Sequence, residues 1–154
     1  MNIFVLDLDP KKAAVQQIDK HVVKMPLETA QMLCTALGRH GLEGTPYKQA
    51  YKKHPCTIWA GDSRNNFQWL VKHGIALSEE YTRRYGRRHK SQDVIEWCQR
   101  HMDTVPEGDR TTFAQAMPEQ YKDEDPVVAY RSYYLGDKAR IAAWKANKPE
   151  WWNK

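Results

Sequence analysis

Residues 63–86 read SRNNFQWLVKHGIALSEEYTRRYG, and this segment has the clearest helical pattern in the chain. Its apolar and small residues recur at intervals of three and four, at Phe67, Leu70, Val71, Gly74, Leu77 and Tyr81. Asp62 or Ser63 is suited to begin the helix, and Gly86 is suited to end it. The segment therefore predicts a long amphipathic helix whose apolar stripe must be covered by other helices.

The sequence after Gly86 predicts two further helices. The first runs from about Ser91 to His101, with apolar residues at helical spacing. Residues 103–125 are irregular and rich in turn-forming residues. Asp125-Pro126 combines a capping side chain with proline at the first helical position, so we expect a last helix from there to Ala146.

The sequence before residue 63 begins with a short apolar stretch, residues 2–8, that we expect to be extended. Asp9-Pro10 is another cap followed by proline, and the helical pattern continues from Lys11 to about Lys24. Pro26 either kinks this helix or begins a second one, which ends at the glycines near residue 40.

Residues 42–57 lack periodicity and predict a loop, which Lys48, Lys52, Lys53 and His54 make basic. The chain shows no repeat and no low-complexity linker, so residues 1–154 are expected to form one domain. The predicted fold class is mainly α, a compact helical bundle with a short extended N-terminal segment and long loops. A chain of this length can bury about two-thirds of its unfolded surface, which is enough for a core of its own.

The composition favours a polyanionic partner. The chain has 24 Lys and Arg against 19 Asp and Glu, a formal net charge of +5, which attracts a polyanion without identifying it. Its 3 cysteines are far apart, and there is no CxxC pair, secretory signal or apolar run of membrane length. We therefore expect a reduced, cytoplasmic location, no structural metal and no membrane association.

Asp7-Leu8-Asp9 offers a competing interpretation, because it follows an apolar run. It is similar to the Asp-x-Asp start of haloacid-dehalogenase-type phosphatases, in which the first carboxylate attacks phosphorus and both bind Mg²⁺. That fold needs several further strands around a parallel sheet, and the sequence offers no second convincing strand. The simpler interpretation is that Asp7 ends the extended segment and Asp9 caps the helix.

Residues 19–28 hold the most suggestive chemistry. Asp19-Lys20-His21 is followed by Glu28, and 28 − 21 = 7 residues place His21 and Glu28 two turns apart on one helix face if Pro26 leaves the helix intact. A carboxylate in such a place can stabilise a sugar cation and move protons. Alternatively, Glu28 complements the dipole of a helix that begins at Pro26, and His21 is a surface residue.

These residues resemble the bacteriophage pyrimidine-dimer DNA glycosylase/AP lyase family, often called endonuclease V. That family has an acidic-x-His tripeptide with a catalytic glutamate seven positions after the histidine. It ends in a basic-Pro-x-Trp-aromatic segment, to which KPEWW at residues 148–152 is similar. Residues 58–61, 80–86 and 117–121 are similar as well, so the resemblance spans nearly the whole chain.

The resemblance implies a DNA N-glycosylase, with or without AP-lyase activity, that removes a damaged or modified base from duplex DNA. Glu28 would stabilise the sugar cation and shuttle a proton, and His21 would orient the sugar-phosphate. The α-amino group of Met1 would attack C1′ and form a Schiff base. We expect no metal or cofactor, and a monomer that works in the cytoplasm, that of the host if the protein is phage-encoded.

The chain departs from the family in two respects. Asn2 disfavours removal of Met1, whereas the family exposes a small residue, and the segment before the histidine motif is several residues longer. Leu27 and Gln31 replace basic residues that flank the glutamate in the family. Two nearby lysines could supply that charge or replace the amine as nucleophile, namely Lys20 and Lys24.

DNA contacts are expected from basic and aromatic residues in four segments. These are Lys20, Lys24, Lys52, Lys53, His54, Arg83, Arg84, Arg87, Arg88, Trp151 and Trp152. The arginines could instead complement the dipole of their helix, and the tryptophans beside Lys148 and Lys154 could instead close the bundle as a hydrophobic clasp. The alternative function is a non-catalytic DNA- or partner-binding phage accessory protein on the same scaffold.

Overall fold

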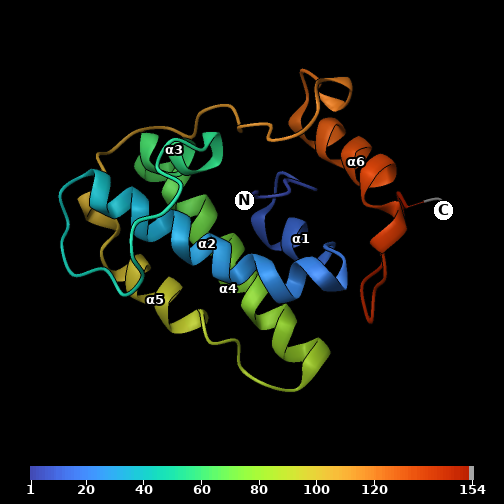
Figure 1. Ribbon diagram of the computed structural model, residues 1–154, viewed down its shortest axis with the longest axis horizontal. Coiled ribbons are helices and arrows are strands. Elements are labelled where there is room, and N and C mark those ends of the chain that lie inside the picture. Colours follow the sequence, from blue (N-terminus) through green and yellow to red (C-terminus); the bar gives the residue numbers. More distant parts are fainter. Residues whose placement is uncertain (153–154) are drawn as a thin grey trace.

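The computed structural model describes residues 1–152, which form helices and irregular segments without a β-strand (Figure 1). The α-helices are α1 (Pro10–Val15), α2 (Asp19–Arg39), α3 (Pro55–Asp62), α4 (Arg64–Tyr85), α5 (Gln92–Arg100) and α6 (Pro126–Asp137). Three short 3₁₀ turns add η1 (Met102–Thr104), η2 (Glu119–Tyr121) and η3 (Ala139–Ile141). The predicted mainly α class is confirmed.

The helix α4 is the centre of the fold and packs against α1, α2, α3 and α5. Its ends are those predicted: the Ser63 hydroxyl accepts a hydrogen bond from the Asn66 amide (3.1 Å), and Gly86 ends the helix at φ 74°. The stripe that includes Phe67, Leu70 and Leu77 is fully buried. The apolar periodicity therefore marks the face that the other helices cover.

The predicted helix from Lys11 to Lys24 is wrong, because the chain breaks between α1 and α2. The break is stabilised by side chains from distant segments. The Arg84 guanidinium donates to the carbonyls of Val15 (2.9 Å) and Gln17 (2.8 Å), and the Trp144 indole donates to the carbonyl of Gln16 (2.9 Å). These donors satisfy carbonyls that a continuous helix would have used itself.

Pro26 lies inside α2 and does not begin a new helix. Two other boundaries differ from the prediction. Residues 55–57 were expected to belong to the loop but begin α3, which His54 caps by accepting a hydrogen bond from the Cys56 amide (3.1 Å). The last helix was expected to reach Ala146 but ends at Asp137, and η3 follows it.

Residues 1–9 contain neither helix nor strand and lie between the α1–α2 region and α6 (Figure 1). The expected extended segment is bent at Phe4, which has φ 49°. Residues 3–6 are almost completely buried. Asp9 caps α1, because its carboxylate accepts hydrogen bonds from the amides of Lys11 (2.8 Å) and Lys12 (3.3 Å). Residues 1–152 contain no parallel sheet, so the phosphatase interpretation of Asp7-Leu8-Asp9 is wrong.

Candidate active site

A cavity of about 340 Å³ opens where residues 1–4, one face of α2 and the α6–η3 region meet. It is lined by Met1, Asn2, Phe4, Lys20, His21, Lys24, Met25, Glu28, Tyr133, Lys138 and Ile141. All three sequence-predicted catalytic residues therefore lie in one cavity. The intact α2 explains the arrangement on that helix, because residues 21, 24, 25 and 28 recur at intervals that share one face.

Glu28 lies between two positive groups inside this cavity. One carboxylate oxygen is 2.9 Å from the α-amino nitrogen of Met1, and the other is 3.4 Å from Nζ of Lys24. The Glu28 side chain is only 8% exposed. Within residues 1–152 neither of its oxygens accepts a well-aligned hydrogen bond, so the charges are paired while the lone pairs stay available to a further donor.

Met1 is held by its side chain. That side chain is 3% exposed while the whole residue is half-buried, so the exposed part of Met1 is its main chain, which carries the amine. Asn2 fixes the next turn, because its side-chain oxygen accepts from the amides of Ile3 (2.8 Å) and Phe4 (3.3 Å) and its amide donates to Ala116 (2.7 Å). The terminus is thereby directed at Glu28 by packing and hydrogen bonds on both sides.

Phe4 forms a wall of the cavity in an unusual backbone conformation. Its ring stacks on the His21 imidazole with centroids 4.1 Å apart and planes 14° apart. At φ 49° the residue occupies the left-handed region, which is unfavourable for a bulky side chain. Strain of this kind is found preferentially at functional sites, where the surrounding structure fixes it.

His21 is neutral in the folded protein. Burial lowers its pKa to about 3, and the positive charges of Lys138 and Lys24 act in the same direction. The Tyr134 hydroxyl lies 2.7 Å from Nδ1 of His21 and also accepts a hydrogen bond from the Ile18 amide (3.4 Å). This contact fixes the orientation of the imidazole ring from its Nδ1 side.

Three lysines surround the cavity. Lys20 and Lys24 come from α2 and were predicted from the sequence. The sequence analysis did not assign Tyr133 or Lys138 to the site, because both lie far along the chain from α2. Tyr133 is on α6, and Lys138 follows its last residue. The Lys138 ammonium lies over the rings of Tyr133 (5.0 Å) and Phe4 (5.9 Å), so an aromatic wall and a cation face the same space.

Arg84 was predicted to bind phosphate, and this prediction is wrong. Its side chain is 0% exposed and ion-pairs with Glu80 (2.8 Å) and Asp19 (3.0 Å). Together with the carbonyls of Val15 and Gln17, these partners accept four of the five guanidinium N–H groups. Arg84 stabilises the fold and is out of reach of DNA.

The other three arginines of this cluster lie nearer to solvent. Arg83 is 58% exposed and pairs with Glu80 (2.9 Å), while Arg88 is 53% exposed and pairs with Asp93 (2.6 Å). Arg87 donates to the Tyr81 hydroxyl (2.8 Å). None of the three lines the cavity, and their role in DNA binding stays a prediction.

The two tryptophans at the C-terminal end pack on the protein. Trp152 is 8% exposed and contacts Trp144 edge to face at 4.9 Å. Trp151 donates to Gln16 (2.9 Å) and lies under the Arg131 guanidinium (5.1 Å). This arrangement is the one expected of a hydrophobic clasp, and in it the buried Trp152 is not available to insert into DNA. Lys154, which was considered together with these tryptophans, lies outside the described residues.

Lys52 and Lys53 are exposed just before α3, and His54 caps that helix. Burial lowers the pKa of His54, the charge of the Met1 amine lowers it further, and the charge of Glu28 opposes this. His54 therefore lies within the electrostatic reach of the amine–carboxylate pair. The segment before α3 adjoins the cavity without lining it.

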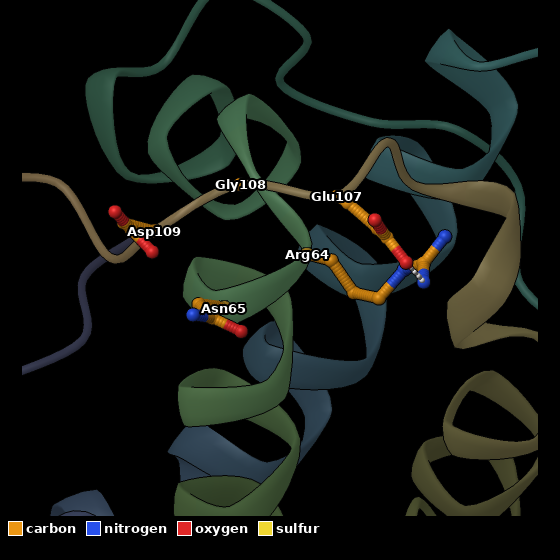
Figure 2. A pocket seen from close by; sticks show the side chains of 5 residues that line it. All are labelled: Arg64, Asn65, Glu107, Gly108 and Asp109. Carbon is orange, nitrogen blue, oxygen red and sulfur yellow. Dashed lines mark hydrogen bonds and ion pairs between the residues drawn. The ribbon is translucent and has the colours of Figure 1, made fainter.

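A larger hollow of about 550 Å³ lies elsewhere, at the start of α4 (Figure 2). Its lining residues are Arg64, Asn65, Glu107, Gly108 and Asp109. The amides of Arg64 and Asn65 donate to the carbonyls of Pro106 (2.9 Å) and Gly108 (3.3 Å), and the Arg64 side chain pairs with Glu107 (3.3 Å). The helix terminus is already satisfied, so this hollow offers no reactive group comparable to the amine–carboxylate pair.

No helix of residues 1–152 is long and apolar enough to cross a bilayer. In the same residues no group of three or more His, Cys, Asp or Glu side chains is placed to hold a metal ion.

The all-α fold places an amine and a carboxylate side by side in a cavity that three lysines surround. Residues 1–93 match the family described as pyrimidine dimer DNA glycosylase, and the chain belongs to this family. The matched region contains Met1, His21 and Glu28, whereas Tyr133 and Lys138 lie outside it. No curated protein and no solved structure gives a significant match.

Proposed function

We propose that this DNA glycosylase releases a damaged pyrimidine from duplex DNA through a covalent intermediate on the Met1 amine, and that AP-lyase cleavage can follow. The observation that carries the proposal is the 2.9 Å contact between that amine and Glu28 in a nearly buried cavity. An amine needs a neutral lone pair to attack carbon, and a carboxylate at this distance is placed to accept its proton. The protein would act as a monomer and without a cofactor.

The first step forms a bond from the Met1 nitrogen to C1′ as the bond from C1′ to the base breaks. The base leaves with the electron pair of that bond and takes up a proton. The positive charge that develops on the sugar is stabilised by the Glu28 carboxylate. Opening of the sugar ring then gives a Schiff base, with Glu28 returning a proton to the ring oxygen.

The lyase step would begin from that Schiff base. Loss of a proton from C2′ expels the 3′ phosphate by β-elimination, and water finally releases the amine. The Glu28 oxygen beside the amine can take up and return protons across this 2.9 Å contact. Retention of Met1 is compatible with this chemistry, since the buried side chain holds the amine in place.

His21 and the lysines would position the substrate. A neutral imidazole can donate a hydrogen bond to a sugar or phosphate oxygen without adding a second cation beside the developing charge. Lys20, Lys24 and Lys138 surround the cavity and would hold the phosphates on either side of the displaced nucleotide. We expect displacement, because the amine lies inside the cavity and C1′ must enter the cavity to reach it.

Excision from a duplex with one pyrimidine dimer, followed by borohydride reduction, tests the proposal. Cleavage of one N-glycosidic bond of the dimer is expected, with the detached base still joined to its neighbouring pyrimidine, together with a covalent protein–DNA adduct that maps to Met1. An adduct on Lys20 or Lys24 would overturn the assignment of the amine. If the protein binds DNA but releases no base from a panel of lesion duplexes, the non-catalytic alternative is correct for this chain.

A further inference from the structure

Tyr51 is the most exposed large apolar side chain of residues 1–152, at 64%. Its backbone has φ 53°, in the left-handed region that favours glycine. An aromatic residue gains nothing for the fold from being exposed in a strained conformation. The position therefore calls for an explanation outside the core.

The conformation of Tyr51 is fixed from both sides. On the preceding side, the Ala50 amide donates to the Thr35 hydroxyl (2.9 Å), which anchors the loop on α2. On the following side, the His54 amide donates to the Tyr51 carbonyl (3.0 Å), and His54 caps α3. Tyr51 is thus the apex of a short turn held between two helices, in the segment that crosses α2 on its way to α3 (Figure 1).

This turn lies beside the active-site cavity. The Thr35 hydroxyl that holds Ala50 also donates to the carbonyl of Gln31, one helical turn after Glu28. At the other end, His54 feels the charges of both the Met1 amine and Glu28. Tyr51 does not line the cavity, and it lies in the same turn as His54, which is within electrostatic reach of the amine–carboxylate pair.

The surroundings of Tyr51 are strongly basic. Lys48, Lys52 and Lys53 are all exposed, and none of them forms a salt bridge within the described part of the chain. Cations on both sides of an exposed aromatic ring are the combination that binds nucleic acid, since the cations contact phosphates and the ring stacks on a base. An acidic protein partner would use the cations but would have no need of a rigidly held ring.

We propose that Tyr51 stacks on the unpaired base that is left in duplex DNA when the opposing nucleotide is displaced or lost, while Lys52 and Lys53 hold the adjacent phosphates. The inference rests on the proposed function only for the position of the displaced nucleotide. The hydrogen bonds on both sides of Tyr51 fix the backbone that carries the ring, which lowers the cost of ordering this turn on binding. Tyr51 is thus a positioning residue that favours sites where a base lacks its partner.

Binding to two duplexes of the same sequence tests this inference. One is undamaged, and the other carries a tetrahydrofuran abasic analogue, which leaves one unpaired base and cannot be cleaved. Tyr51→Gly removes the ring and also suits the positive φ, so it should fold at least as well as the wild type. It should bind the abasic duplex roughly 5-fold to 150-fold more weakly, the range that stacking of one base on an aromatic ring contributes.

The affinity of Tyr51→Gly for the undamaged duplex should be unchanged. Tyr51→Trp keeps an aromatic ring and should keep the preference for the abasic duplex. The control is Val128→Ala, at another exposed apolar residue, and it should match the wild type on both duplexes. Equal weakening on both duplexes would make Tyr51 a general DNA contact and overturn the inference. So would an unchanged preference in Tyr51→Gly, or no preference in the wild type. Because the analogue requires no catalysis, base excision measured separately shows whether the proposed function fails on its own.

Discussion

Replacing Glu28 with glutamine keeps the shape of the side chain and removes its negative charge from the cavity. The carboxylate is 2.9 Å from the Met1 amine and 3.4 Å from the Lys24 ammonium, and it is 8% exposed. In the variant the amine has no acceptor for its proton, and the sugar has no counter-charge. Base release should therefore fall while DNA binding persists.

The size of the loss follows from the geometry. A sugar carrying about half a positive charge roughly 3.5 Å from the carboxylate gains about 2 kcal/mol at an effective dielectric constant of about 20, which is roughly 50-fold in rate. Loss of the proton acceptor adds about 10²-fold or more. We expect base release in a single turnover to slow by at least about 10³-fold, and affinity for the lesion duplex to stay equal or rise slightly as one negative charge near the phosphates disappears.

Single-turnover excision and equilibrium binding on the same lesion duplex measure the two effects. Glu79→Gln is the matched control, because Glu79 is an exposed glutamate on α4 outside the cavity. A urea titration of each variant shows that any loss of rate is not a loss of fold. A Glu28→Gln rate within about 10-fold of the wild type would mean that Glu28 provides neither the counter-charge nor the proton acceptor.

A short peptide extension in front of Met1 should abolish borohydride trapping, because it converts the amine into an amide without a free lone pair; equal adduct yields with and without the extension would exclude the amine as nucleophile. Arg84→Met should lower the free energy of unfolding by roughly 3–5 kcal/mol, since it removes a buried ion-pair partner of Glu80 and the donors to the carbonyls of Val15 and Gln17, whereas the exposed Arg83→Met should cost less than about 1 kcal/mol; urea titrations that give equal costs would contradict the burial argument. The pKa of His21 is lowered from 6.5 to about 3 in the folded protein, so the unfolded chain binds the extra proton first, and stability falls as pH drops from 6.5 toward 3, by up to about 5 kcal/mol from this group. The pKa of the buried His73, lowered to about 4, adds to the same loss, and a flat stability between about pH 7 and pH 4 would refute both assignments.

The sequence predicted best those features that depend on neighbouring residues. Asp9-Pro10 and Asp125-Pro126 begin helices, and Ser63 with Gly86 bounds α4, because a cap is formed by side chains within a few positions of the helix end. The spacing of His21 and Glu28 is informative for the same reason, since an unbroken helix brings them onto one face. Pro26 left two interpretations open, and only the packing of α2 decides between them.

The errors lie where distant residues meet. Arg84 is part of a basic run, and counting charges suggests a phosphate contact. In the structure its guanidinium satisfies carbonyls at the α1–α2 break, so a single arginine both ends a predicted helix and is lost from the DNA-binding set. The available signal was Glu80, which precedes it by one helical turn and is fully buried.

The cavity itself could not be predicted as a whole, because its two sides come from opposite ends of the chain. Met1, His21 and Glu28 lie in the region that matches the family, and they bring an amine, an imidazole and a carboxylate to the cavity. Tyr133 and Lys138 lie outside that region and supply an aromatic wall with a cation over it.

Two hydrogen bonds join the N-terminal segment to the later part of the chain: Asn2 donates to the Ala116 carbonyl (2.7 Å), and the Arg131 guanidinium donates to the Leu6 carbonyl (3.0 Å). These bonds connect the N-terminal segment to the α6 region, so a shift of α6 would move Tyr133 and Lys138 together with the Met1 amine. In such a site the proposed reactive groups and the proposed nucleotide-binding wall come from distant parts of the sequence but lie next to each other in space. The chemistry can then be preserved while substitutions at Tyr133 or Lys138 change which nucleotide fits against it.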